Sequence, residues 1–245
     1  AAAWLGYRCL DRDTLVARIA AHGVSPAGLR AALEEPPTVW DRFRHTKYVY
    51  LSLVRAALAE TALEGNVVYH GNAGHLLLQG VSHVMRARVI APLSSRVAAI
   101  RQSQECSEEA AVDQIRKIDQ ERHQWARALY GIDWSDASLY DLVLNLEHLT
   151  VDQACEIIAA TARQDAFRET AASRSALRDL AVASRVQAQL AVTPETLHLE
   201  VEVVARDGAI VVRGAWSAAA ESDSVLSIAG QVPGVQSVGV EVVTG

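Results

Sequence analysis

The stretch "NVVYHGNAGHLLL" at residues 66–78 carries the pattern that decides the fold. A short apolar run reaches Gly71, a second glycine follows at Gly74, and the chain then becomes apolar again. This pattern is typical of a strand that passes through a loop into a helix. Such a loop binds a phosphate, binds a substrate, or only connects two elements.

The glycine spacing in this loop argues against an ATP phosphate loop. That loop needs G-x-x-x-x-G-K-[ST], in which backbone N–H groups and a lysine face the phosphates. "GNAGH" lacks this spacing, and no other segment of the sequence supplies the motif. His70 and His75 flank the loop without acidic or cysteine partners, so no metal site is predicted there. Spacing alone favours an ordinary strand–turn–helix connection.

Strand and helix patterns alternate around this stretch as far as residue 164. Strands are predicted at 7–11, 66–71, 83–92 (a buried strand) and within 139–149. Helices are predicted at 12–23, 25–35, 41–65, 93–104, 107–131 (continuous or broken) and 151–164. The alternation predicts an α/β fold with a parallel sheet covered by helices on both faces.

A smaller unit is predicted after residue 164. Residues 165–191 are rich in Ala, Arg and Ser and have a helical pattern, whereas 196–217 alternates with period two around Asp207–Gly208. Asp-Gly between alternating apolar runs is a strong hairpin signal. A helix at 218–234 and a strand at 235–243 complete an αββαβ order, typical of a small α+β domain.

Composition narrows the class of protein. The chain has 245 residues, of which 50% are hydrophobic and 21% charged, with a net charge of −6, so a globular protein without an affinity for nucleic acid is expected. There is no apolar run of about 18 residues and no signal peptide, so no membrane span is predicted. Cys9, Cys106 and Cys155 are far apart and form no CxxC, which suits reduced thiols in a cytoplasmic protein.

The helix predicted at 107–131 is the main candidate for binding chemistry. Residues on one face recur at three- to four-residue steps, namely Arg116, Asp119 or Gln120, His123 and Arg127, and Arg122 follows Asp119 by three. Several guanidinium groups on one helix can clamp phosphates. The alternative is a solvated face with ion pairs worth ~0.3–0.5 kcal/mol each. A second basic segment at 36–48, which includes Arg42, either binds an anion or a base or begins a helix.

Several motifs together resemble the cytidylate-kinase-like family of bacterial P-loop kinases. They are "EEPPTVWDRF", the 66–78 stretch with its continuation to Ile100, Asp-x-x-Arg at Asp119–Arg122, "YGIDW" and "LYDLVLN". The resemblance covers about residues 1–163. It implies transfer of a phosphoryl group from ATP, with Mg²⁺, to a nucleoside monophosphate such as CMP, a reaction that depends on positioning and positive charge.

The resemblance also assigns roles to single residues. Arg116 and Arg122 would be lid arginines that stabilise charge on the transferring phosphate, with Asp119 orienting Arg122. The residues implied on the side of the phosphate acceptor are Asp11, Arg42, Gly71, Asn72 and Gly74. Asn72 stands where related kinases carry an arginine, so this chain has one phosphate donor fewer.

The start of the chain departs from the family pattern. The family begins with a strand and a glycine-rich phosphate loop, and this chain begins with "AAAWLGYRCLD", in what resembles the tail of the following helix, with Gly6 as its stop. We therefore expect a P-loop-kinase-like domain at 1–164 without its first strand and P-loop. The chain is either a fragment of a kinase or a member that has lost the motif, and it should bind ATP poorly and transfer slowly.

The second predicted unit, residues 171–245, resembles a BON domain. The motifs are the Asp-Gly hairpin, "V-x-G" at Val212–Gly214 and "VPGVQSV" before the last strand. The resemblance implies a lipid or protein partner for this domain. Two hypotheses follow for the whole chain: a nucleotide kinase with an appended binding domain, or a non-catalytic module that senses a nucleotide or a partner. An oligomerising structural protein is a third, supported only by the exposed edges of a small sheet.

Overall fold

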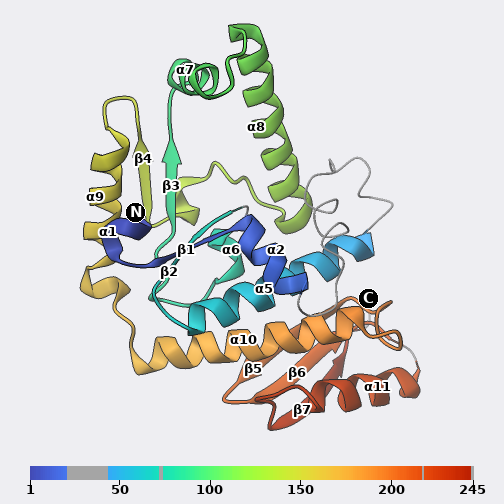
Figure 1. Ribbon diagram of the computed structural model, residues 1–245. Coiled ribbons are helices and arrows are strands. Elements are labelled where there is room, and N and C mark those ends of the chain that lie inside the picture. Colours follow the sequence, from blue (N-terminus) through green and yellow to red (C-terminus); the bar gives the residue numbers. More distant parts are fainter. Residues whose placement is uncertain (21–43, 72–73, 217, 244–245) are drawn as a thin grey trace. The chain divides into compact units, whose positions relative to one another are not determined.

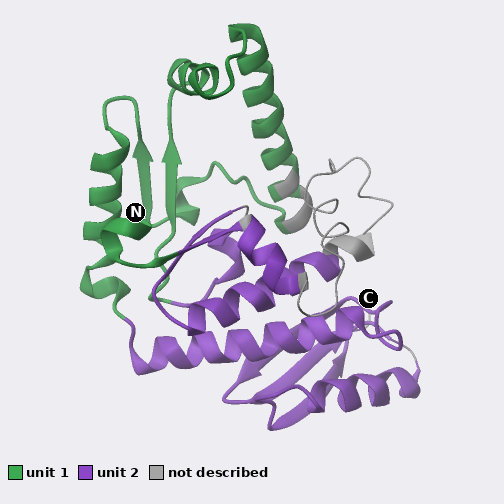
Figure 2. Ribbon diagram, viewed as in Figure 1, with its two compact units in different colours: residues 1–8, 36–39, 82–168 green, residues 9–35, 40–81, 169–245 purple. Residues whose placement is uncertain are grey.

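The computed structural model describes residues 1–20, 44–71, 74–216 and 218–243 (Figure 1). The chain forms two compact units, each assembled from separate segments (Figure 2). Unit 1 comprises residues 1–8, 36–39 and 82–168, and unit 2 comprises 9–35, 40–81 and 169–245. In the described ranges, no helix is both long and apolar enough to cross a membrane.

Unit 1 contains a two-stranded parallel sheet and a long helical hairpin. Its elements in chain order are α1 (Ala2–Leu5), β3 (Ala87–Ile90), α7 (Leu93–Gln104), α8 (Glu108–Tyr130), the 3-10 turn η1 (Ala137–Leu139), β4 (Leu142–Asn145), α9 (Val151–Ala162) and the 3-10 turn η2 (Asp165–Phe167). Strand β3 pairs with β4 in parallel, with Ala87 opposite Leu142 and Ile90 opposite Asn145. Helix α1 packs on α9, where Arg163 Nη2 donates to the Trp4 carbonyl oxygen at 2.9 Å.

Unit 2 contains the sheet β1–β2 and a three-stranded sheet in the order β5–β6–β7. Its elements are β1 (Arg8–Asp11), α2 (Arg12–Ala20), α5 (Arg44–Leu63), β2 (Val67–His70), α6 (Gly74–Leu77), α10 (Ala171–Val192), β5 (Val201–Arg206), β6 (Ala209–Gly214), α11 (Ala219–Gly230) and β7 (Ser237–Val242). Strand β6 pairs antiparallel with β5 and parallel with β7.

Local signals in the sequence explain where many of these elements begin and end. Gly6 ends α1 in the left-handed conformation, and Ser107 caps α8 by accepting a hydrogen bond from the Ala110 N–H. Thr150 and Gln153 form a capping box at the start of α9. Asp207–Gly208 joins β5 to β6 with positive φ at both residues, as a two-residue hairpin turn requires. The αββαβ order of the last 75 or so residues is confirmed.

The predicted α/β class with parallel strand pairing is confirmed, but the described residues do not form one continuous parallel sheet. They form β1–β2 and β3–β4 as separate two-stranded sheets. The strand expected to be buried within 83–92 is largely exposed, with Val89 49% and Ile90 38% exposed. A strand buries both of its faces only where other elements pack on both sides of its sheet. Helix α8, expected to be either continuous or broken, is continuous. The helix predicted at 25–35 lies outside the described residues.

Helix α10 is the centre of unit 2, where it lies between α5 and the three-stranded sheet (Figure 1). Val186 and Leu190 pack on the sheet residues Val203 and Val212 in one buried cluster. Arg174 Nη2 donates to the Leu63 carbonyl oxygen at 3.4 Å. Burying α10 on two sides explains why so much of it is apolar or small.

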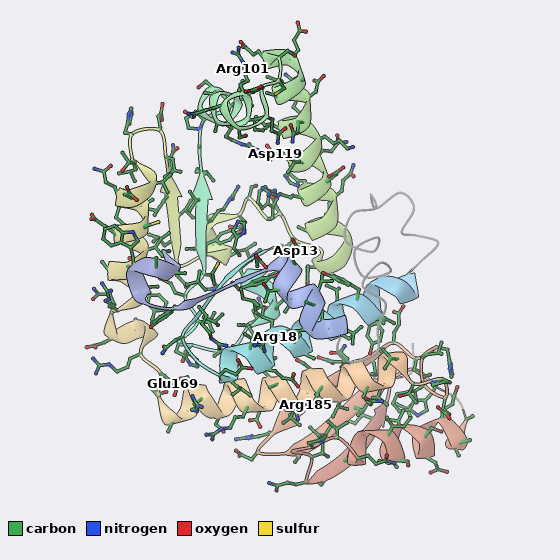
Figure 3. The ribbon with its side chains drawn as sticks, in the orientation of Figure 1. Asp13, Arg18, Arg101, Asp119, Glu169 and Arg185 are labelled. Atoms are coloured by element: carbon green, nitrogen blue, oxygen red, sulfur yellow. The ribbon has the colours of Figure 1, made fainter. Side chains whose placement is uncertain are left out.

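Two further contacts join the first part of the chain to the last within unit 2. Arg185 and Glu60 form an ion pair at 2.9 Å between α10 and α5 (Arg185, Figure 3). The Tyr48 hydroxyl donates to the Val201 carbonyl oxygen at 3.0 Å and accepts from the Val201 N–H at 3.1 Å. The compact units therefore do not follow the predicted division into 1–164 and 171–245, and the independence of these two segments stays a prediction.

Candidate functional site

The helical hairpin α7–α8 of unit 1 carries the candidate site. Its turn is fixed by Glu105, which ends α7 in the left-handed conformation, and by the Ser107 cap of α8. Val97 of α7 packs against Ala111 and Ile115 of α8 in a small buried cluster. These contacts hold the two helices side by side, so side chains further along them can meet.

Arg96 and Asp119 form a bidentate ion pair between the two helices (Asp119, Figure 3). Arg96 Nη1 donates to Asp119 Oδ2 at 2.6 Å, and Nη2 donates to Oδ1 at 2.8 Å. The hydrogen bonds from Arg96 lower the pKa of Asp119, partial burial opposes this, and the charges of Arg96, Arg122 and Arg88 lower the pKa further. Three guanidinium groups therefore act by charge on the Asp119 carboxylate, and one of them, Arg88, acts on Asp133 as well.

This pairing corrects one prediction. Asp119 was expected to orient Arg122, but its hydrogen bonds go to Arg96, and Arg122 acts on it through charge alone. The Arg122 guanidinium lies over the Trp134 ring instead, 5.7 Å from the ring centroid. Arg116 is exposed on the same helix, and its predicted lid role stays a prediction.

Arg88 of β3 brings a third guanidinium group to the site. It lies 4.7 Å from the centroid of the Trp134 ring and 5.6 Å from that of Tyr140. Its Nη1 donates to the Trp134 carbonyl oxygen at 3.2 Å, and its buried Nε has no hydrogen-bond partner among the described residues. An unsatisfied buried donor on a cation suits an anionic ligand.

The sequence patterns did not identify Arg88 or Arg96 as site residues. A usable signal existed for Arg88, because a charged residue between the apolar residues of a strand needs a partner. No comparable signal existed for Arg96, whose partner is 23 positions away in the sequence.

The residues predicted on the acceptor side belong to unit 2. Asp11 caps α2, since its Oδ1 accepts from the Thr14 N–H at 2.8 Å. The hydrogen bonds from Thr14 lower the pKa of Asp11, and the nearby His70 at the end of β2 adds to this effect. The structure thus brings Asp11 and the start of the 66–78 stretch close together. Arg42 and Asn72 lie outside the described residues.

The two glycines of the opening stretch make room for an aromatic ring. A Cβ atom at Gly71 would meet the Tyr69 hydroxyl and ring, and one at Gly74 would come within 2.5 Å of Tyr69 Cδ1. Neither glycine is in the left-handed region, so the requirement comes from close approach and not from backbone conformation. The spacing of these glycines is explained by Tyr69, which leaves their predicted substrate role a prediction.

A second bidentate ion pair fixes the strands from which Arg88 projects. Arg86 Nη2 donates to Asp141 Oδ1 at 2.8 Å, while the Arg86 N–H and Nε donate to Oδ2 at 2.7 and 3.1 Å. These hydrogen bonds lower the pKa of Asp141, and partial burial opposes them. The pair joins the start of β3 to the start of β4.

This ion pair predicts a pH dependence of stability. Because the pKa of Asp141 is lower in the folded chain than the usual ~3.9, the pair stabilises the fold above about pH 4, and the contribution is lost as the pH falls through the folded pKa. Between pH ~5 and ~3, we expect the free energy of unfolding to fall by about 1 kcal/mol more in the unchanged chain than in Asp141→Asn. The difference is this small because the ion pair is partly exposed to solvent. Urea unfolding followed by circular dichroism measures this, and equal pH dependence in both proteins would contradict it.

The arginine cluster suits phosphate groups better than metal ions. Guanidinium forks match the geometry and charge of phosphate oxygens. Among the described residues, no group of three His, Cys, Asp or Glu side chains could hold a metal ion.

The chain is a mixed α/β protein in which a helical hairpin and a neighbouring strand bring several arginines together. Such a cluster is typical of proteins that bind phosphate groups. The model of the cytidylate kinase-like family matches residues 2–148, more than half of the sequence, so the chain belongs to that family.

Curated relatives agree with this assignment over part of their length. A cytidylate kinase from Staphylothermus marinus is 33% identical over 101 residues, which are 40% of this chain and 55% of the relative. A cytidylate kinase from Sulfolobus acidocaldarius is 30% identical over 95 residues, 39% of this chain and 52% of the relative. The chain thus spans about half the length of these kinases.

Two other similarities are weaker guides. A uronate isomerase from Corynebacterium glutamicum is 31% identical over 104 residues, which are 42% of this chain and only 20% of that protein. The crystal structure of an uncharacterized protein from Eubacterium ventriosum has a TM-score of 0.49 and 13% identity, covering 64% of this chain and 84% of that one. A likeness of this degree does not assign a fold.

Proposed function

We propose that this chain is part of a nucleotide kinase that transfers a phosphoryl group from ATP to a nucleoside monophosphate such as CMP. The observation that carries the proposal is the Arg96–Asp119 fork with Arg88 and Arg122 beside it, which brings three guanidinium groups together. Phosphoryl transfer needs positive charge around the equatorial oxygens and accurate positioning more than covalent catalysis. Membership of the cytidylate kinase-like family supports the same reaction.

In this proposal the arginines have separate tasks. Arg122 and Arg96, on facing helices, bind phosphate oxygens from two sides and neutralise charge as the phosphoryl group moves. Arg88 adds a fixed positive charge from the strand below them. Arg116, exposed on α8, binds the nucleotide when the hairpin closes. ATP with Mg²⁺, when bound, supplies the phosphoryl group and the metal charge.

The acceptor is proposed to bind near the 66–78 stretch. Asp11 and His70 lie close together there, and Gly71 and Gly74 expose main chain beside the Tyr69 ring. Arg42 and Asn72 complete the proposed acceptor side. An asparagine in place of an arginine binds a monophosphate more weakly, because it lacks the positive charge and the bidentate guanidinium donors.

Binding without turnover is the second candidate function. The sequence contains no G-x-x-x-x-G-K-[ST] motif, and that motif supplies the main-chain cradle for the β- and γ-phosphates. With this sequence alone, we expect nucleotides to bind and phosphoryl transfer to be slow or absent. Residues 171–245 are proposed to be a BON-like domain that binds a protein or lipid partner, supported by their αββαβ order.

Calorimetric titration of the 245-residue chain with ATP, CMP and pyrophosphate tests the proposal. We expect binding, and stabilisation by ~2.7 kcal/mol when a ligand is present at 100 times its Kd. The Arg116→Ala, Arg122→Ala double variant should lose most of this binding, while Arg101→Ala on α7 should not. Failure of all three ligands to bind would overturn the proposal, and a coupled assay for ADP would separate kinase from sensor.

A further inference from the structure

The loop between α8 and β4 places one tryptophan in contact with two of the site's arginines. Trp134 lies under the Arg88 guanidinium at 4.7 Å and the Arg122 guanidinium at 5.7 Å, each measured to its ring centroid. Both distances are within the range of a cation–π interaction. The two cations come from different elements, β3 and α8, and the ring lies against both of them.

The main chain of Trp134 is used as well. Its carbonyl oxygen accepts from Arg88 Nη1 at 3.2 Å and from the Tyr140 hydroxyl at 2.8 Å. Tyr140 also places its own ring 5.6 Å from the Arg88 guanidinium. These contacts orient the Arg88 side chain, and its buried Nε has no acceptor in the part of the chain that the structure describes.

The turn that carries Trp134 is itself fixed. Asp133 Oδ1 accepts from the Ser135 N–H at 2.8 Å and from the Ser135 hydroxyl at 2.6 Å. His123 of α8 lies 3.5 Å from the same carboxylate oxygen. These contacts hold the main chain beside Trp134, together with the hydrogen bond from Arg88 to the Trp134 carbonyl oxygen.

Two neighbouring guanidinium groups repel each other and would separate without a group that attracts both. The negative face of an indole provides that attraction without the full charge of a carboxylate, which would compete with a phosphate for the same donors. Asp119 accepts two hydrogen bonds from Arg96, whereas Arg88 and Arg122 contact the indole and act on Asp119 through charge alone.

We propose that Trp134 is a positioning residue that holds Arg88 and Arg122 ready for the phosphates of a nucleotide. This inference rests on the function proposed above. Trp134 does not touch the reacting atoms; it acts through the two arginines, and the order that it imposes in the free protein reduces the ordering needed when the ligand binds.

The test uses the 245-residue chain, pyrophosphate as the probe, and three variants. Trp134→Leu keeps an apolar side chain and removes the π face, so the Kd for pyrophosphate should rise about tenfold. Trp134→Phe restores a π face and should recover most of that loss, to within about threefold of the unchanged chain. Trp4→Leu is the matched control, because Trp4 is also in unit 1 and also accepts an arginine hydrogen bond at its carbonyl oxygen.

A second readout needs no ligand. In the unchanged chain, the side-chain N–H resonances of Arg88 and Arg122 should carry a ring-current shift that disappears in Trp134→Leu and persists in Trp4→Leu. Loss of this shift with an unchanged Kd would overturn the positioning role while leaving the proposed function in place. Equal Kd values for the Leu and Phe variants would also overturn it, because a purely structural role needs no π face. Failure of the unchanged chain to bind pyrophosphate would overturn both proposals.

Discussion

Replacing Arg96 with alanine is expected to weaken binding of ATP and pyrophosphate by about a hundredfold, the largest effect of any single change in the arginine cluster. Two losses add in this variant. The phosphate loses a charge-assisted donor, worth about 1.5–3 kcal/mol, and Asp119 is left without its fork partner. The unpaired carboxylate then repels the phosphate and competes for Arg122, whose charge already acts on it. Calorimetric titration at a fixed salt concentration measures the change.

Three further variants separate these two losses. Arg96→Lys keeps the charge but not the planar fork and should lose about tenfold. The double variant Arg96→Ala, Asp119→Asn removes the carboxylate as well and should regain part of the affinity, because the repulsion is gone. Arg101→Ala changes an exposed arginine on the same helix, 51% exposed and 3.6 Å from Glu108, and should change the Kd by less than about twofold. Equal affinities for Arg96→Ala and the unchanged chain would show that the hairpin is not the phosphate site.

The same pair of residues shows where reading the sequence reaches its limit. The spacing of Arg116, Asp119 and Arg122 placed a basic, helical surface at 107–131, and helix α8 is there. Spacing within one helix cannot report a partner on another helix, so Arg96 was missed and Asp119 was assigned to Arg122. Trp134 was noticed only as part of "YGIDW", because its relation to Arg88 and Arg122 exists only in three dimensions.

Element boundaries were predictable where a single residue carries the physical reason. Gly6, Ser107 and Thr150 end or begin helices through conformations and hydrogen bonds that involve only their near neighbours. Burial was less predictable. The apolar residues Val89 and Ile90 suggest a buried strand, yet burial depends on which elements cover the strand, and the strand pattern does not specify them.

Replacing Leu177 with alanine is expected to destabilise unit 2 by about 2–5 kcal/mol, because this side chain on α10 is fully buried and its loss leaves a cavity. The variant also tests whether residues 171–245 fold alone. Helix α10 packs on α5 as well as on the sheet, and Arg185–Glu60 and Arg174–Leu63 join the two helices on either side of Leu177. We therefore expect α5 and β5–β7 to unfold together, with hydrogen exchange accelerating in both when Leu177 is shortened.

Hydrogen exchange followed by mass spectrometry resolves this prediction segment by segment. Val192→Ala changes a residue of the same helix that is 41% exposed and should cost less than about 0.5 kcal/mol. If Leu177→Ala accelerates exchange in β5–β7 but not in α5, residues 171–245 form an independent domain, as their resemblance to a BON domain implies. If exchange accelerates equally in β5–β7 and in α5, helix α10 belongs to the core that supports the 66–78 stretch. Helix α5 connects that core to the stretch, because Arg55 of α5 donates to the Leu77 carbonyl oxygen of α6. A partner bound to the C-terminal sheet would then be able to alter the proposed acceptor site through α10 and α5, since both sites would depend on one cooperative core.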